Sequence, residues 1–294
     1  MPVTVHPPPS AAQAQADQLS SPLRLIVADV DDTFTFHGSL HPAVLSAVAR
    51  ASQAGLEVIL NTGRPAGYGA TLLAYVAGVS AVIVENGGAW FDRQAPGAPP
   101  DPHEVPICYR TLAAPDLRAR LADLAQRVGL RAGLSFVPTA DNAFRVTDYT
   151  VLRRLPADAE PAAVLRQLGA YVAEESDGRG QFLASSIHLH FMLDGQTPRS
   201  KADGVAALLR HRGVADPYGY MATSAVSVGD SANDSSLFSP GRFALSVGVA
   251  NIRRYLPELG PNRPRHITTH AEGLGLVELI DAILAGTPPS GVAG

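Results

Sequence analysis

Three aspartates follow a short apolar segment near the start of the chain and limit its fold more than any other feature. Residues 25–28 are Leu, Ile, Val and Ala, a composition typical of a strand buried in a parallel sheet. Asp29, Asp31 and Asp32 come directly afterwards, and crowded carboxylates repel one another unless a cation or a substrate proton relieves them. We therefore expect a divalent metal site at the carboxyl end of a central strand, where open α/β sheets bind their ligands. The alternative is a solvated turn in which Asp32 caps a helix.

The same pattern of apolar segment and polar turn recurs in the first hundred residues. A helical pattern over Pro42–Ala54 leads to an apolar segment at Leu56–Leu60. A second helical pattern, roughly Gly69–Ala77, leads to another apolar segment at Ala81–Val84. This alternation predicts an α/β fold, a Rossmann-like parallel sheet with helices on both faces. The polar turns then meet at one edge of the sheet.

A change of pattern after residue 93 indicates a second domain inserted into the first. Arg93–Pro106 contains five prolines, and mixed helices and half-buried strands follow, as in an α+β domain. The predicted strands are Ile107–Leu112, Leu134–Pro138, Ala143–Thr147, Gln181–Ser185 and Ile187–Leu193, and the predicted helices are Asp116–Val128 and Pro161–Glu174. The earlier alternation resumes with a helix at Ala202–His211 and a strand at Ala225–Val228. The predicted domains are a core of residues 23–95 and 197–288, an inserted α+β cap of residues 96–196, and tails at 1–22 and 289–294.

Composition excludes several classes of protein. The net charge of −4 and the lack of a Lys/Arg cluster argue against nucleic-acid binding. No apolar run approaches the ~20 residues of a membrane span, and residues 1–22 lack the features of a secretory signal. The single cysteine, Cys108, excludes an internal disulfide framework. We expect a cytoplasmic protein, and no feature of the sequence indicates its oligomeric state.

Polar side chains from four separated segments converge on the predicted sheet edge. They are Asp29 and Asp31, Thr62 and Gly63, Lys201, and Asp230 and Asp234. Magnesium prefers hard oxygen ligands and keeps several waters, and a phosphoryl group in transfer needs positive charge and donors around its oxygens. Asp29 can serve as a nucleophile that forms an aspartyl-phosphate. Asp31 is then placed to protonate the leaving oxygen and afterwards to activate water.

Four motifs in this chain resemble the signature motifs of the haloacid dehalogenase-like superfamily, in the order that this family uses. They are DVDDT at 29–33, NTGR at 61–64, Lys201 and GDSAND at 229–234. The insert between the second and third motifs resembles the C2-type cap. VENGG at 84–88 is similar to a turn of the Cof-type, or IIB, branch. That branch contains sugar-phosphate phosphatases and, as a minority, phosphomannomutases.

The resemblance implies a role for each residue. Asp29 is the nucleophile and first metal ligand, and Asp31 is the acid/base, which also ligates the metal through its carbonyl. Thr62 and Lys201 hold the phosphoryl group. The implied catalytic residues are Asp29, Asp31, Thr62 and Lys201; the substrate-binding residues are Thr62, Gly63, Arg64, Asn86, Lys201 and Asn233; the Mg²⁺ ligands are Asp29, Asp31, Asp230 and Asp234. No chemistry is assigned to Asp32.

Several residues allow a structural interpretation as well. Asp230 could only cap its helix, Asp234 could be a solvated helix residue, and Lys201 could lie on the surface. Arg64 could bind the loop around it or contact substrate.

In the cap, His188 and His190 lie two positions apart on one face of a predicted strand. They could form a zinc site, or they could simply be histidines on the polar face of that strand. Either histidine, or Arg145 or Arg179, could reach a sugar or a carboxylate of the substrate.

The function expected from these observations is a Mg²⁺-dependent phosphatase acting on a small phosphorylated metabolite, most simply a sugar phosphate. Two alternatives remain open at this point: a sugar phosphomutase of the phosphomannomutase kind, and a non-catalytic phosphometabolite-binding protein. Inserted domains commonly close over substrate. We therefore expect hinges near Arg93–Pro100 and Leu193–Arg199.

Overall fold

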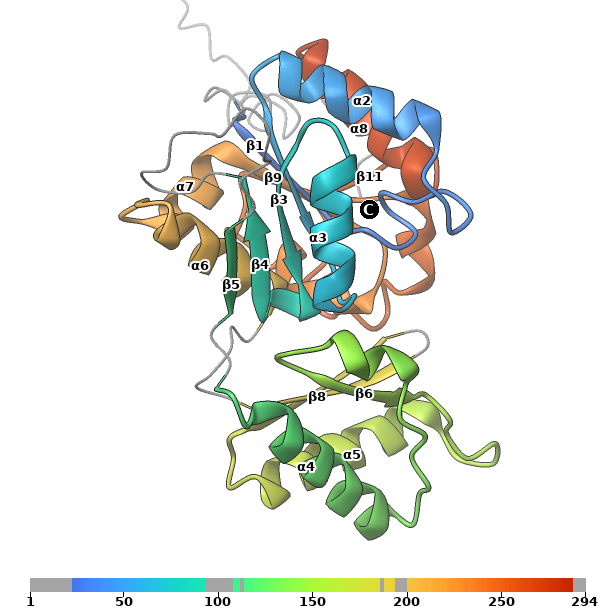
Figure 1. The fold of residues 1–294 in the computed structure, drawn as a ribbon. Helices are drawn as coiled ribbons and strands as arrows, with labels where there is room; N and C mark the ends of the chain where they lie inside the picture. Colours follow the sequence, from blue (N-terminus) through green and yellow to red (C-terminus); the bar gives the residue numbers. More distant parts are fainter. Residues whose placement is uncertain (1–22, 94–107, 112–113, 186–187, 194–199, 288–294) are drawn as a thin grey trace, which may run out of the picture.

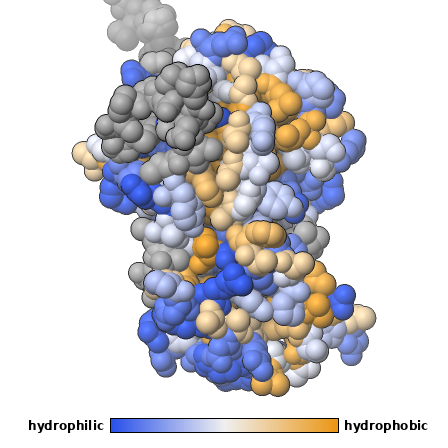
Figure 2. Space-filling view, viewed as in Figure 1, coloured by the Kyte–Doolittle hydropathy of each residue, from blue (hydrophilic) through white to orange (hydrophobic). Residues whose placement is uncertain are grey.

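The chain folds into a larger and a smaller body, shown one above the other in Figure 1. The computed structural model describes residues 23–93, 108–111, 114–185, 188–193 and 200–287. The predicted tails, domain boundaries and hinges fall almost entirely outside these ranges and stay predictions. On the face in view, hydrophobic and hydrophilic residues are interspersed over both bodies, including where the bodies meet (Figure 2). Among the described helices, none combines the length and the apolar character needed to cross a membrane.

The larger body is built on an eight-stranded sheet with the order β11-β10-β9-β1-β2-β3-β4-β5. Its strands are β1 (Leu25–Ala28), β2 (Glu57–Asn61), β3 (Val79–Val84), β4 (Ala89–Asp92), β5 (Cys108–Thr111), β9 (Ala225–Gly229), β10 (Leu245–Gly248) and β11 (His266–Ile267). Neighbours from β11 to β3 are parallel, whereas β4 and β5 are antiparallel. The predicted α/β class with a parallel core sheet is confirmed.

Helices cover both faces of this sheet because its central strand is apolar on both sides. Ile26 and Ala28 belong to one apolar core and Leu25 and Val27 to another, as the two-residue period of a strand requires. The first core also contains residues of α2 (Pro42–Gln53), α3 (Ala66–Tyr75) and α8 (Glu272–Leu284), and the second contains residues of α6 (Lys201–His211) and α7 (Pro217–Ser224). The sheet is therefore the middle of three layers.

The pairing of β1 brings three polar turns to the same edge. Ala28 at the end of β1 lies opposite Leu60 of β2 and Val228 of β9. The residues that follow these strands, including Asp29 and Asp230, therefore emerge side by side. This is the convergence expected from the sequence, and it defines where ligands can bind.

The smaller body is a three-stranded antiparallel sheet covered by two helices. Its strand order is β6-β8-β7, and its apolar core lies between this sheet and the helices. The elements are β6 (Tyr149–Leu152), β7 (Gly180–Ala184), β8 (His188–Leu193), α4 (Leu117–Ala132) and α5 (Pro161–Glu175). An α+β arrangement was expected here.

Two of the predicted strands in this region are wrong. In the segment 134–138, Pro138 makes only an isolated bridge to Val151, and the segment 143–147 begins within a short 3₁₀ helix, η3 (Ala140–Phe144). The side chain of Asn142 accepts from the amide of Thr150 and donates to its carbonyl. Such local side-chain bonds stabilise a turn in place of a strand.

The larger body also contains two strands and a helix that the sequence pattern did not assign to it. Residues 108–111, expected among the strands of the insert, pair with β4 and so extend the larger sheet. The hairpin strand β4 and helix α7 were not predicted. Helix α7 contains glycine, tyrosine and threonine, which are weak helix formers. It is capped by Asp216, whose side chain accepts from the amide of Gly219.

Glu85 forms a buried polar joint between the two bodies. It begins the short 3₁₀ helix η2 (Glu85–Gly87) after β3 and is 1% exposed. Its carboxylate accepts from the amides of Val146, Thr147 and Asp148 and from the Thr147 hydroxyl, at 2.6 to 3.2 Å. Burial, and then the charge of Asp148, raise the pKa of Glu85 to about 7. Gly88 lies beside the same segment, where a Cβ would overlap Thr147.

We expect Glu85→Ala to lower the free energy of unfolding by about 3 kcal/mol, because several buried donors lose their acceptor. Denaturant titration followed by circular dichroism measures this change. Glu258→Ala, at an exposed position, is the matched control and should stay within ~0.5 kcal/mol of wild type. Equal effects of the two substitutions would contradict the structural role of the joint.

Candidate active site

A cavity of about 250 Å³ opens at the sheet edge and is bordered by both bodies. From the larger body it is lined by Asp29, Asp31, Asp32, Gly38, Gly63, Arg64, Asp230, Ser231, Asn233 and Tyr255, and from the smaller body by Arg145, Ser185, His188 and His190. Four of the sequence motifs thus lie on or directly behind one cavity wall.

Lys201 lies behind this wall and joins two of the aspartates. Its ammonium is 2.5 Å from Asp29 Oδ1 and 2.6 Å from Asp234 Oδ1, and all three side chains are buried. Burial works to lower the pKa of Lys201, but the carboxylates of Asp234 and Asp29 outweigh it and the net shift is upward. Asn61 fixes the start of α6 by donating to the carbonyl of Lys201. Lys201 is therefore a buried charge of the site, and the surface interpretation is wrong.

Asp234 and Asp230 occupy different places in the loop after β9. Asp234 is fully buried at the third position of η4 (Ala232–Phe238), and its Oδ2 accepts from the amides of Asp230 and Ser231. The cap of η4 is made by Ser231 together with Asp234. Capping therefore does not explain Asp230, and Asp234 is not a solvated helix residue.

The buried aspartates fit a divalent cation. Carboxylate oxygens of Asp29, Asp230 and Asp234 all lie within 4.8 Å of one another. Burial, and then the charge of Asp234, raise the pKa of both Asp29 and Asp230 well above the ordinary value. Three carboxylates face one ammonium, so the cluster is short of positive charge. Hard oxygen donors at this spacing suit a cation such as Mg²⁺.

Asp31 lies at the rim and is held by Arg64. The guanidinium donates through Nε to both Asp31 oxygens, at 3.0 and 2.9 Å, and through Nη2 to Oδ1 at 2.6 Å. Both side chains are partly exposed, and both line the cavity. Arg64 therefore binds the loop, one of its two expected roles, while its contact with substrate stays a prediction.

The turn after β2 places a hydroxyl and a glycine next to the cavity. Thr62 is buried, and its hydroxyl accepts from the amide of Arg64. Gly63 lines the cavity, and a Cβ there would lie 3.1 Å from Asn86 Oδ1. A glycine thus allows the two turns to pack closely.

Asn86 and Asn233 line a second cavity that borders the same group of charged residues. Asn86 is buried with a φ of 56°, and neither polar atom of its side chain has a partner. It lines a separate cavity of about 300 Å³ that also contacts Lys201 and Asn233. Asn233 lines both cavities. Asn86 is thus placed near the site but not on the main cavity.

The structure adds residues that sequence reasoning missed. Asn251 donates to Asp230 Oδ2 at 3.0 Å and to the carbonyl of Asp32 at 3.1 Å. It follows β10, so the signal that identified the other turns, a polar residue after an apolar strand, was also present here. Asp32 itself has a φ of 56° and donates its amide to Thr35 Oγ1, as a turn residue would.

Among the residues that the structure describes, His188 and His190 belong to no group of three potential metal ligands. His190 Nδ1 lies 2.8 Å from Asp148 Oδ2. Within the described residues, the only group with metal-ligand spacing is that of Asp29, Asp230 and Asp234. Arg145 and both histidines border the main cavity, whereas Arg179 lines a different hollow and faces Asp177.

Solved structures share this fold over most of the chain. A haloacid dehalogenase-like hydrolase from Bacteroides thetaiotaomicron has a TM-score of 0.60 at 17% identity, covering 89% of this chain and 99% of its own. The sucrose-phosphatase of Synechocystis, solved with sucrose and phosphate, has a TM-score of 0.57 at 18% identity, covering 89% and 98%. A sugar phosphatase of haloacid dehalogenase subclass IIB has a TM-score of 0.54 at 14% identity, covering 83% and 93%.

These similarities establish the fold that the motifs implied, that of haloacid dehalogenase-like hydrolases with their IIB relatives. No protein-family model matches the sequence, and no curated protein matches it.

We expect added Mg²⁺ to raise the midpoint of thermal unfolding, and to raise it more at about pH 8.5 than at about pH 5.5. Aspartates whose pKa is raised by folding bind extra protons in the cation-free state, so that state loses stability as the pH rises through this window. A cation must displace these protons, and it therefore binds more weakly in acid. Differential scanning calorimetry at both pH values measures the increment.

Asp230→Asn removes one carboxylate of the cluster and is the matched variant for this measurement. Its increment with Mg²⁺ should be small at both pH values. An increment in wild type that is absent, or larger in acid, would contradict the assignment of the cation site.

Proposed function

We propose that this chain is a Mg²⁺-dependent phosphatase of the haloacid dehalogenase type, acting on a small phosphorylated metabolite such as a sugar phosphate. The observation that supports this most is the contact of Lys201 with Asp29 inside a cluster of buried carboxylates. The fold is shared with hydrolases whose names include two sugar phosphatases. A phosphoryl group requires such a combination of a nucleophile, a cation and fixed donors.

Asp29 is the proposed nucleophile. One of its carboxylate oxygens attacks phosphorus, the bond from phosphorus to the leaving oxygen breaks, and an aspartyl-phosphate forms. Lys201 is bonded to Oδ1 of Asp29, so it orients the carboxylate and balances part of its charge. Water then attacks the same phosphorus, which releases inorganic phosphate and restores Asp29.

Asp31 is the proposed acid and base. It gives a proton to the leaving oxygen in the first step and takes one from the attacking water in the second, help worth on the order of 10²–10⁴-fold. Both of its oxygens accept from Arg64 in the structure, so turnover requires Asp31 to exchange part of this contact for the leaving oxygen. Arg64 is then free to approach the substrate.

The proposed phosphoryl-binding residues include Lys201, which contacts the proposed nucleophile Asp29. Thr62, Gly63 and Lys201 supply a hydroxyl, a backbone amide and an ammonium, with Arg64, Asn86 and Asn233 at the margin. The proposed Mg²⁺ ligands are Asp29, Asp31 through its carbonyl, Asp230 and Asp234. When bound, the cation would neutralise charge on the phosphoryl oxygens.

We expect Asp29→Asn to reduce kcat for p-nitrophenyl phosphate by at least about 10³-fold, because an amide cannot replace the nucleophilic carboxylate. Steady-state release of nitrophenol with and without Mg²⁺ measures this. Asp32→Asn, three residues away in a turn that asparagine tolerates, should stay within about tenfold of wild type. If wild type and Asp29→Asn are equally inert across a broad panel of phosphorylated metabolites, the phosphatase proposal fails.

We also expect inorganic phosphate and free sugar from a hexose phosphate. In the proposed reaction water, rather than a second sugar oxygen, accepts the phosphoryl group from Asp29. Analysis of a labelled hexose phosphate by chromatography, together with a phosphate assay, separates the two outcomes. Isomerised sugar phosphate without free phosphate would identify a phosphomutase.

A further inference from the structure

The turn after β2 leaves one backbone amide available beside the main cavity. The amide of Thr62 donates to the carbonyl of Ile83 at 2.9 Å, and the amide of Arg64 donates to the Thr62 hydroxyl at 3.0 Å. Within the described part of the chain, the amide of Gly63 donates to no residue. Gly63 also lines the cavity. Its amide is therefore the donor of this turn that remains for a phosphoryl oxygen.

The carbonyls of the same turn are held from outside the turn. Two backbone amides of η2 donate to the carbonyls of Thr62 and Arg64, each at 3.0 Å. Between them, Nη1 of Arg145 donates to the carbonyl of Gly63, also at 3.0 Å. The two outer donors are backbone groups of the larger body, whereas the middle donor is a side chain of the smaller body.

Gly63 depends on these contacts for its conformation. A glycine has no Cβ, so its backbone can adopt more conformations than that of other residues. The peptide group from the Gly63 carbonyl to the Arg64 amide is bonded at both ends, to Arg145 at the carbonyl and to the Thr62 hydroxyl at the amide. Loss of the bond from Arg145 would release one end of this peptide group and allow Gly63 to turn.

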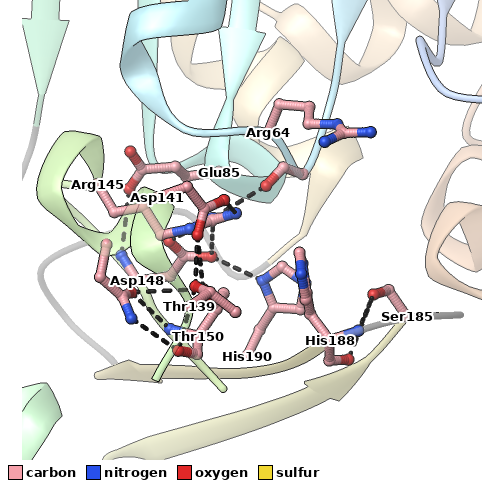
Figure 3. Close-up of polar contacts among 12 residues, drawn as sticks. Arg64, Glu85, Thr139, Asp141, Arg145, Asp148, Thr150, Ser185, His188 and His190 are labelled. Carbon is pink, nitrogen blue, oxygen red and sulfur yellow. Dashed lines mark hydrogen bonds and ion pairs between the residues drawn. The ribbon is translucent and has the colours of Figure 1, made fainter. Parts of the chain in front are cut away.

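Arg145 is itself held in place by carboxylates of the smaller body, as Figure 3 shows. Nη1 also donates to both oxygens of Asp148, at 2.9 and 3.0 Å, and Nη2 donates to Asp141 Oδ2 at 2.8 Å. Asp148 is fully buried, and its Oδ2 lies 2.8 Å from His190 Nδ1. The guanidinium is therefore fixed on the smaller body and presents Nη1 to the carbonyl of Gly63.

The same contacts leave Arg145 poorly placed to bind the leaving group directly. Arg145 borders the main cavity, but its side chain is only 1% exposed. Asp148 and Asp141 balance its charge, and its Nε is buried. The bond that Arg145 makes to the larger body is the one to the Gly63 carbonyl, so the sequence-based expectation of a direct substrate contact gives way to an indirect role.

We infer that Arg145 is a positioning residue for phosphoryl binding, which holds the Gly63 carbonyl and so orients the Gly63 amide toward a phosphoryl oxygen in the cavity. The smaller body thus supports the phosphoryl group without touching it, and the turn keeps its binding conformation while the two bodies are in contact. This inference rests on the proposed phosphatase function. It adds a residue from the body that supplies none of the proposed catalytic groups.

The first test observes the Gly63 amide directly by NMR. Thr62–Gly63 is the one Thr–Gly pair in the sequence. Protein labelled at the carbonyl carbon of threonine and the amide nitrogen of glycine therefore gives a single amide signal in a spectrum filtered through the carbonyl. With Mg²⁺ present, inorganic phosphate should move the wild-type amide proton downfield, as expected when an amide donates to an anion. A wild-type signal that phosphate does not move would overturn the inference.

The same spectrum of Arg145→Lys tests the role of the guanidinium. Lysine keeps the charge beside Asp148 but lacks the planar fork that binds this carboxylate and the Gly63 carbonyl together, so the downfield movement at saturating phosphate should be at most about half that of wild type. Arg166→Lys, at a position that is 74% exposed, is the matched control and should respond as wild type does. A full movement in Arg145→Lys would contradict the positioning role.

A milder variant covers the case in which Arg145→Lys does not fold. Asp141→Ala removes the acceptor of Nη2 at a partly exposed position and so loosens the guanidinium of Arg145. The phosphate-induced movement of the Gly63 amide should again be smaller than in wild type. If it is unchanged, Arg145 does not position the turn.

The second test separates phosphoryl positioning from leaving-group binding. Arg145→Lys should lower kcat/KM by about tenfold for p-nitrophenyl phosphate and by the same factor for a hexose phosphate, because the two substrates share the phosphoryl group. The inhibition constant of inorganic phosphate should rise by a similar factor. Thermal unfolding of each variant confirms that the comparison is between folded proteins.

The outcomes of the second test distinguish this inference from the proposed function. A loss confined to the hexose phosphate would assign Arg145 to the leaving group, overturning the inference and leaving the phosphatase proposal standing. A wild-type protein that hydrolyses no substrate, but whose Gly63 amide still responds to phosphate through Arg145, would overturn the phosphatase proposal and support the positioning of the turn.

Discussion

The ammonium of Lys201 between Asp29 and Asp234 is the interaction on which the rest of the structure depends. A buried lysine needs anionic partners, and buried carboxylates need a cation, so neither is stable here alone. The contact joins the end of β1 to the first turn of α6, which are 172 positions apart in sequence. Because α6 follows the smaller body, the larger body is completed only after the chain has passed through the insert and returned.

Much of the core could be predicted because its central parallel strands are apolar segments that end in polar turns. Segments such as Leu25–Ala28 and Ala225–Gly229 are buried on both faces, so their local composition is sufficient to identify them. The short strands of the cap were harder to predict from the sequence, because whether such a segment forms a strand depends on the strand with which it pairs. Residues 149–152 pair with β8 in the sheet, while the equally plausible 143–147 does not, since Asn142 binds Thr150 and closes a turn.

The aspartates and the lysine of the site could be predicted from their motifs. Some of the residues that form hydrogen bonds within the site and between the two bodies could not be predicted. Asn251 and Glu85 are single polar residues whose contacts lie far along the chain, such as Asp32 and Thr147. The periodic pattern of apolar residues in the sequence carries no information about contacts between residues so far apart. Glu85 belongs to the turn at 84–88, and the resemblance of that turn to one of the Cof-type branch implies no role for its carboxylate.

The joint around Glu85 has a consequence for how the two bodies could separate. Its buried contacts are hydrogen bonds between a carboxylate, backbone amides and a hydroxyl, and Arg145 adds a bond to the Gly63 carbonyl. Water can replace each of these hydrogen-bonding partners, whereas separating an apolar contact of the same size would expose an apolar patch. The polar part of this contact would therefore become hydrated if the two bodies separated, while the side chain of Val146, which packs against the apolar core of the larger body, would be uncovered.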